Sequence, residues 1–219
     1  MKKIAVILCG SGFKDGSEIR ESVAVLLALS RHGASVQCFA PDKAQADVIN
    51  ALTGEPMVGE TRNMLVEAGR IARGAISPLS QLQVSQFDAV IIPGGFGVAK
   101  NLCTFGTEGS KGKVLPELKT ILEKFYSEKK PIGAVCIAPA VLALTFTEKQ
   151  LELTVGPKSE ASDEIEKLGH KHRVTHPSQC YVDTKNKIVS TAAYMCEAPL
   201  HEIFEGIERL TEEVLALIP

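Results

Sequence analysis

The sequence predicts an α/β fold in which a mostly parallel, doubly wound sheet carries helices on both faces. Short apolar runs typical of buried strands alternate along the chain with segments whose apolar residues recur at helical spacing. Several of these strands end at glycine-bearing turns, and the sites of such sheets open at the carboxyl ends of strands. The length of 219 residues suits one large core, and no segment resembles a linker. We therefore expect a single domain over residues 1–219.

The N-terminal half is expected to supply three strands and three helices. The strands are assigned to residues 3–8, 35–39 and 87–92, and the helices to residues 17–33, 44–52 and 61–74. Ser17 is the expected cap of the first helix. One face of that helix carries the side chains of Ile19, Val23, Leu26, Leu27 and Ser30. Glu18 and Glu21 lie on another face in its first turn, where acidic side chains suit the helix dipole.

The C-terminal half continues the alternation. Its strands are assigned to residues 130–136, 151–155 and 187–192, and its helices to residues 115–129, 137–144, 162–168 and 199–217. The loop over residues 103–113 holds several small polar residues and is expected to cover the site as a lid. Glycines that follow the strand at residues 87–92, Gly94 and Gly95, would let backbone N–H groups point at a ligand.

Cys136 lies where the strand at residues 130–136 gives way to a helix. The residues two before and two after it, Ala134 and Ala138, are small enough to pack against each other at a sharp corner, and Pro139 suits the first helical turn. This spacing is that of a nucleophile elbow with cysteine in place of serine. A thiol there would meet free backbone N–H groups that favour the thiolate. The alternative is that Cys136 is a small buried residue without a chemical role.

Composition limits the classes of function. A net charge of −2 without a basic cluster argues against binding to nucleic acid or an anionic membrane. Six scattered cysteines without a Cys-x-x-Cys motif indicate a reducing compartment. The chain enters a strand within a few residues of Met1 and has no apolar run of membrane-spanning length, so we expect a cytoplasmic protein. Gly10 and Gly12 match the first two glycines of the Gly-x-Gly-x-x-Gly dinucleotide-binding motif, but the third glycine is absent, so this interpretation is weak.

Three of the five histidines, His170, His172 and His176, fall within seven residues of one another. They could form a solvated turn, supply a base to Cys136, or bind zinc. The zinc alternative is the weakest because the cluster lacks a carboxylate or thiolate at familiar ligand spacing. We predict no metal site.

Four separated motifs resemble one known family. They are Gly-Ser-Glu-Ile-Arg-Glu-Ser-Val at 16–23, Ile-Ile-Pro-Gly-Gly-Phe-Gly at 91–97, Ala-Val-Cys-Ile-Ala-Pro at 134–139 and Asn-Lys-Ile-Val-Ser-Thr-Ala-Ala-Tyr-Met at 186–195. The chain resembles the class I glutamine amidotransferase-like, PfpI-type superfamily, and within it the branch of enhancing lycopene biosynthesis protein, or isoprenoid biosynthesis glyoxalase. The resemblance covers nearly the whole chain and implies a flavodoxin-like sheet.

The resemblance also implies roles for particular residues. By position, Glu21 matches the glutamate that contacts the thiol in the superfamily. Gly95 matches the residue that supplies the first oxyanion N–H, and Ile137 matches the residue that supplies the second. His172 best matches a histidine seen in the branch. Two departures matter. The residue after the nucleophile is Ile137 rather than the histidine of the PfpI proteases, and His176-Pro177 is followed by Ser178 rather than the glutamate of the amidotransferases.

The implied activity is that of a cofactor-independent glyoxalase acting on glyoxal or a similar small dicarbonyl through Cys136. A cysteine redox sensor, an interaction protein and a protein deglycase remain alternatives. We expect a homodimer, no cofactor, and residence in the cytoplasm or, in a eukaryote, the mitochondrial matrix. The pocket should be small and poor in charge, with Gly95, Phe96 and Ile137 in its wall, and Glu21 should be protonated while Cys136 is thiolate.

Overall fold

A seven-stranded sheet with the order β3-β2-β1-β4-β5-β9-β8 forms the centre of the computed structural model, which describes residues 1–219. All neighbouring strands are parallel except β8, which runs antiparallel to β9. The strands are β1 (Lys3–Ile7), β2 (Ser35–Ala40), β3 (Ile76–Pro78), β4 (Ala89–Ile92), β5 (Ile132–Val135), β8 (Cys180–Asp183) and β9 (Ile188–Thr191). The predicted mostly parallel sheet is confirmed.

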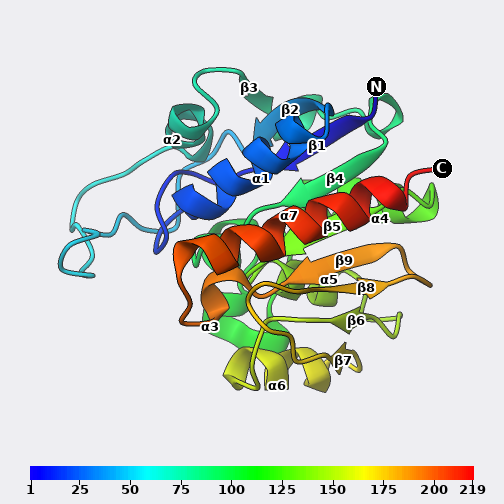
Figure 1. Cartoon of the computed structure of the whole chain (residues 1–219). Helices are drawn as coiled ribbons and strands as arrows, with labels where there is room; N and C mark the ends of the chain where they lie inside the picture. Colours follow the sequence, from blue (N-terminus) through cyan, green and yellow to red (C-terminus); the bar gives the residue numbers. More distant parts are fainter.

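Helices cover both faces of this sheet (Figure 1). On one face lie α1 (Ile19–Arg31) and α7 (Leu200–Ala216), which pack side by side, and on the other lie α4 (Pro116–Ser127) and α5 (Pro139–Thr145). The remaining elements lie at the edges or at the strand ends. They are α2 (Met64–Ile71), α3 (Phe105–Glu108), α6 (Glu160–Lys167) and the small parallel pair β6 (Glu152–Leu153) and β7 (Lys171–His172).

The central strands are apolar apart from Lys3 at the start of β1, because helices cover them on both sides. Every residue of β4 and of β5 is buried, as are the last four of β1. A continuous apolar run is the sequence signature of such a strand, which is why these three were predictable. Their carboxyl ends lie next to one another in the middle of the sheet.

The helix expected over residues 44–52 is absent, which corrects that prediction. The segment is irregular and is held by isolated antiparallel bridges, Ala44 with Asn63 and Ile49 with Pro56. Its backbone N–H groups bond to distant side chains: the Ile49 N–H donates to Asp15 and the Ala46 N–H to Asn101. These bonds replace the helical ladder, and the loop projects from the body of the molecule (Figure 1).

The burial of α1 also differs from expectation. Ile19, Val23 and Leu27 on the predicted apolar face are nearly half exposed, and the face that carries Glu21 and Val25 is buried. Ser22, Ala24 and Ala28 on the buried side are small, and α1 packs against α7. The helix is capped by Glu18, whose side chain accepts the Glu21 N–H, rather than by Ser17. The Ser17 hydroxyl instead accepts the Cys9 N–H.

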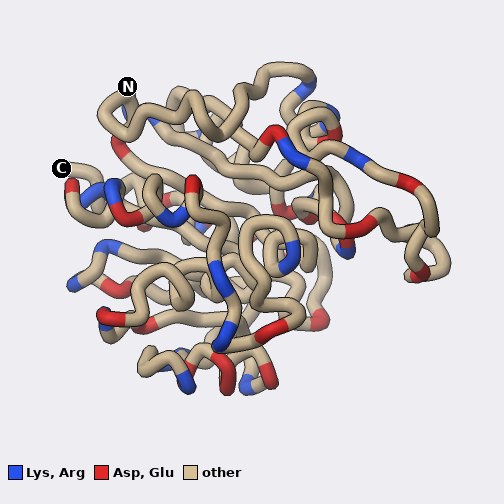
Figure 2. Tube along the Cα trace, turned by 180° about the vertical axis from the view of Figure 1, so that it is seen from behind, with Lys and Arg blue, Asp and Glu red and all other residues tan.

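Short elements were not predictable from periodicity. β3, β7 and β8 have two to four residues of mixed polarity, too few for a pattern to emerge. Lysine and arginine are interspersed with aspartate and glutamate along the trace (Figure 2). None of the helices combines the length and the hydropathy that a bilayer span requires.

Candidate active site

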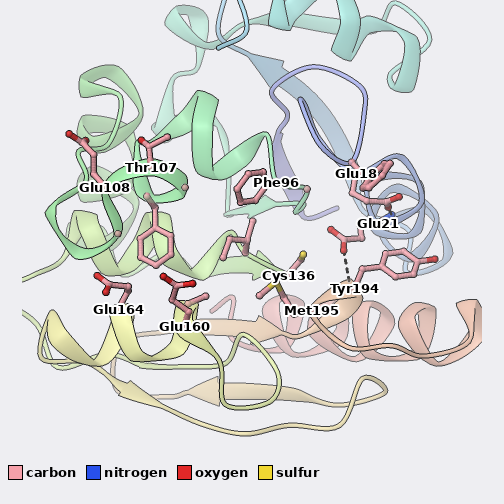
Figure 3. Close-up of a pocket in the computed structure, with 17 residues that line it drawn as sticks. Glu18, Glu21, Phe96, Thr107, Glu108, Cys136, Glu160, Glu164, Tyr194 and Met195 are labelled. Atoms are coloured by element: carbon pink, nitrogen blue, oxygen red, sulfur yellow. Dashed lines mark hydrogen bonds between the residues drawn. The ribbon is translucent and has the colours of Figure 1, made fainter. Parts of the chain in front are cut away.

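The site lies at the carboxyl ends of three adjacent strands, β1, β4 and β5. The chain runs from β1 outward to β2 and β3 and then returns to β4 on the other side of β1. The sheet order therefore reverses between β1 and β4, which is where doubly wound sheets bind ligands. Glu21 on α1, the loop after β4 and Cys136 after β5 all meet there (Figure 3).

Cys136 occupies a sharp corner between β5 and α5. Its φ is 61°, a left-handed conformation that is uncommon for a residue with a Cβ atom. The Cys136 N–H donates to the Thr191 carbonyl at 2.8 Å and so continues the pairing of β5 with β9. Ala134 and Ala138 are fully buried on either side, and Pro139 begins α5. The strained corner turns the thiol toward the cavity.

The loop after β4 approaches the corner so closely that only glycine fits. A Cβ atom at Gly94 would overlap Cβ of Cys136 and Oε2 of Glu21. Gly95 has a φ of 107°, and a Cβ atom there would overlap the backbone of Gly16 and Glu18. The Gly94 carbonyl in turn accepts the Glu18 N–H at 2.8 Å, which joins the loop to the start of α1.

Gly94→Ala should separate Cys136 from Glu21, because the added methyl group competes with both side chains for the same space. We expect the free energy of unfolding to fall by about 1–3 kcal/mol, and the rate of Cys136 alkylation to change with it. Denaturant titration and mass spectrometry of the alkylated peptide measure the two effects. Gly69→Ala, in α2 with only a side-chain contact at 3.8 Å, is the control and should not be destabilised. Equal behaviour of the two variants would contradict the proposed close fit.

Glu21 is a fully buried carboxyl group beside the thiol. Its Oε1 accepts the Tyr194 N–H at 3.2 Å, whereas Oε2 receives no hydrogen bond from a nitrogen or oxygen donor of the protein. Burial raises the pKa of Glu21 to about 8, with the charge of Glu18 acting in the same direction. The carboxyl group is therefore mainly protonated at neutral pH, as the sequence analysis predicted.

The predicted thiolate is not favoured. Burial and the adjacent Glu21 raise the pKa of Cys136 well above its ordinary value, and these effects exceed the opposing influence of the Gly95 and Ile137 N–H groups. The resting pair is a thiol beside a carboxylic acid. Desolvation has the largest effect on the pKa of Cys136 because the corner is nearly closed to solvent, with Cys136 only 7% exposed. Even so, the N–H groups of Gly95 and Ile137 face the sulfur, where the sequence analysis placed an oxyanion hole.

The cavity above Cys136 is larger and more acidic than expected. Its volume is about 630 Å³, and five glutamates lie in its wall. The predicted wall residues Gly95, Phe96 and Ile137 are present. The segment expected to form a lid contributes Phe105 to Gly109, but α3 and a short 3₁₀ turn occupy most of it, so the prediction of a loop is wrong. Glu108 comes from the segment expected to form a lid, whereas Glu160 and Glu164 come from α6, which the sequence analysis did not connect with the site (Figure 3).

The three clustered histidines do not converge on this cavity. His172 is in β7, and its Nε2 accepts the Val155 N–H at 3.4 Å. His170 is buried and bonds through its ring to the backbone of Ala143 and Leu151, while His176 is exposed beside Ser178. The placement does not support His172 as a catalytic residue, because parallel pairing of β6 with β7 directs it elsewhere. No group of three potential metal ligands occurs in the structure.

Several residues of the site were not found from sequence. Tyr194 follows β9, and its backbone N–H fixes Glu21. The available signal was its position directly after a predicted strand, at the edge where the other site residues gather. Glu160 and Glu164 gave no such signal, since they lie in an acidic helix, and such a composition is typical of a solvent-exposed surface.

Comparison with known proteins agrees with this arrangement. The model of the DJ-1/PfpI family matches residues 2–200. The "ES1 protein homolog, mitochondrial" of Rattus norvegicus is 45% identical over 98% of this chain and 84% of its own length. A crystal structure described as an isoprenoid biosynthesis protein with an amidotransferase-like domain, from Ehrlichia chaffeensis, is 40% identical with a TM-score of 0.93 over the whole of both chains.

A more distant structure shares the fold alone. Glyoxalase III from Candida albicans is 14% identical, with a TM-score of 0.62 over all of this chain and 98% of its own. The strand order, the cysteine corner and the family match together lead to one conclusion. The chain belongs to the DJ-1/PfpI family.

Proposed function

We propose that this protein is a cofactor-independent glyoxalase-type enzyme that converts glyoxal or a similar small dicarbonyl to a hydroxy acid. The observation that carries the proposal is the buried pair of Cys136 and Glu21, a nucleophile and a proton carrier in contact with one cavity. The fold that the chain shares with a protein described as glyoxalase III supports it. The description of the rat relative as mitochondrial supports a mitochondrial location in a eukaryote.

The first step is addition of the Cys136 thiol to one aldehyde of the substrate. A bond forms between sulfur and carbon, and the thiol proton passes to the carbonyl oxygen, which gives a hemithioacetal. The N–H groups of Gly95 and Ile137, which face the sulfur, are placed to polarise that oxygen. No oxidant or reductant is consumed.

The second step moves a proton between the two substrate carbons. Glu21 in its carboxylate form removes the proton from the carbon bonded to sulfur and returns a proton to the neighbouring carbon, through an enediol. The product is a thioester, which water hydrolyses to glycolate and the free thiol. Because the pKa of Glu21 is about 8, the carboxylate is the minor form at neutral pH, and turnover should rise with pH toward that value.

The cysteine redox sensor is the less favoured alternative. Oxidation of cysteine follows its thiolate character and exposure. Cys136 has a pKa well above its ordinary value and is 7% exposed, so the resting thiol is poorly suited to react with peroxide. Addition of the thiol to a carbonyl fits the pair better than oxidation does, because Glu21 lies beside the thiol and can carry a proton.

Purified protein should consume glyoxal at least about 10²-fold faster than it hydrolyses glutamine, since amide cleavage requires a general acid for the leaving amine. No histidine contacts the cavity to serve as that acid. Glycolate is followed by proton NMR and ammonia release from glutamine by a coupled assay. Glutamine hydrolysis at an equal or greater rate would restore the amidotransferase interpretation.

A further inference from the structure

The wall of the cavity is acidic and contains no basic side chain. Its five glutamates are Glu18, Glu21, Glu108, Glu160 and Glu164, and no lysine, arginine or histidine joins them. Glu164 is neutralised by an ion pair with Lys167 and accepts the Ser110 N–H at 2.6 Å. Glu21 is mainly protonated at neutral pH and carries little charge. Glu18, Glu108 and Glu160 form no ion pair, so these three carboxyl groups of the wall have no cationic partner.

The acidic groups lie at two ends of the cavity (Figure 3). Cys136, Glu21 and Glu18 are at one end, whereas Glu108, Glu160 and Glu164 are at the other. Apolar side chains, among them Phe96, Phe105 and Ile137, line the space between them. Glu108 is exposed and bonds only to Thr104, and Glu160 is exposed at the start of α6. This second end has negative charge without a partner.

The buried end offers an independent indication of a ligand. Oε2 of Glu21 is inaccessible to solvent, receives no hydrogen bond from a protein nitrogen or oxygen, and lies beside Cys136 in the cavity wall. A buried carboxyl oxygen without such a partner is costly unless a ligand or a proton satisfies it. In the resting site the proton of Glu21 can satisfy this oxygen, whereas the carboxylate form that acts as the base has no such partner until a ligand supplies one. The reacting end of a ligand therefore belongs at Glu21 and Cys136, and the remainder extends toward Glu108 and Glu160.

We propose that the cavity takes a carbonyl compound that carries a positively charged group, ammonium or guanidinium, at the end remote from its aldehyde. The aldehyde meets Cys136 and Glu21, and the cation lies at the end of the cavity that Glu108, Glu160 and Glu164 line. This inference rests on the proposed function, which it narrows to a substrate class. The volume of about 630 Å³ supports it, because glyoxal has four non-hydrogen atoms and would leave most of that space unused.

Apart from Lys167, no basic residue near the cavity forms an ion pair with its glutamates. Lys100 forms an ion pair with Asp47 and lies over the ring of Phe96. The Arg20 guanidinium donates a hydrogen bond to the Tyr194 hydroxyl. Neither of them is part of the wall. A cleft lined by one sign of charge with apolar walls concentrates ligands of the opposite sign and repels those of the same sign.

The rate at which charged thiol reagents modify Cys136 tests the charge preference without requiring turnover. Methanethiosulfonates bearing trimethylammonium, methyl or sulfonate groups are compared, with the Cys136 peptide quantified by mass spectrometry and Cys136→Ser as the control for the other thiols. Each rate is divided by the rate of the same reagent with a small free thiol. In the wild type this normalised rate should be at least about tenfold higher for the cationic reagent than for the anionic one. Equal rates would overturn the proposal.

Two double variants that remove the same charge from different places show which glutamates cause the preference for the cationic reagent. Glu108→Gln with Glu160→Gln should bring the cationic and anionic rates to within about threefold of each other. Asp163→Asn with Glu166→Gln removes the same charge from the outer side of α6, where both residues are exposed beside Lys158, and should leave the preference intact. If both double variants lost the preference equally, general surface charge would explain it and the proposed subsite would be wrong.

Turnover of three arylglyoxals separates this inference from the proposed function. Phenylglyoxal is compared with its 4-trimethylammonio and 4-carboxy derivatives, which share one reactive group and differ in charge. We expect kcat/KM to be highest for the cation and lowest for the carboxylate, and the order to disappear in the Glu108→Gln, Glu160→Gln variant. Equal turnover of all three would overturn the inference alone. No turnover of any of them or of glyoxal, with the reagent preference present, would overturn the proposed function alone.

Discussion

Cys136→Ser should lower glyoxal turnover by about 10⁴-fold or more, the scale of loss when the nucleophile of a covalent catalyst is removed. A serine hydroxyl at this corner stays protonated and is a far weaker nucleophile than sulfur, and Glu21, itself mainly protonated at neutral pH, is a poor base for it. The replacement is nearly isosteric, so the fold should be retained. Glycolate formation measures the first effect and thermal unfolding the second.

Cys103→Ser is the matched control. Cys103 is also buried but does not line the cavity, and its sulfur lies near the carbonyls of Val98 and Ala99. This variant should keep wild-type turnover. If Cys103→Ser lost turnover while Cys136→Ser retained it, the assignment of the nucleophile would be wrong.

Glu21→Gln should lose about 10²- to 10⁴-fold in turnover while Cys136 still reacts with an alkylating reagent. The amide fills the same space and still accepts the Tyr194 N–H, but it cannot take a proton from substrate carbon. Glu18→Gln should lose much less, because Glu18 caps α1 through the Glu21 N–H and a glutamine oxygen can accept the same bond. Wild-type turnover in Glu21→Gln would make the carboxyl group a purely structural residue.

The same variant should change the dependence of stability on pH. Folding raises the pKa of Glu21 from 4.5 to about 8, so the folded protein holds this proton more tightly than the unfolded chain. Its contribution to stability is therefore fully present below pH 4.5 and is lost as the pH rises through 8. At about 1.4 kcal/mol per pH unit, the loss reaches about 5 kcal/mol. The Glu21→Gln variant should not show this loss of stability with rising pH, because its amide does not titrate.

Denaturant unfolding at several pH values between 5 and 9 measures the effect. The free energy of unfolding of the wild type should fall relative to that of Glu21→Gln as the pH rises, and the difference should level off above pH 8. Glu205→Gln, exposed on α7, is the control and should follow the wild type. A difference between wild type and Glu21→Gln that stayed constant with pH would show that Glu21 ionises normally in the folded protein.

The sequence by itself determined the elements that obey strong local rules. The central strands were predictable because burial on both faces demands a continuous apolar run, as in Ala89–Ile92. The corner at Cys136 was predictable because a direct turn from strand to helix requires small neighbours, which Ala134 and Ala138 supply. Gly94 and Gly95 were recognisable for a similar reason, since close backbone approach excludes larger residues.

Only the tertiary structure decided what surrounds the thiol. The carboxyl groups that line the cavity come from the start of α1, the lid segment and α6, which lie far apart in sequence and meet only when the chain packs around the sheet. The protonation of the pair likewise depends on desolvation, a property of the assembled site rather than of any local segment. The irregular path of residues 44–52 has the same origin, because the side chains of Asp15 and Asn101 supply the hydrogen bonds that a helix would otherwise have made.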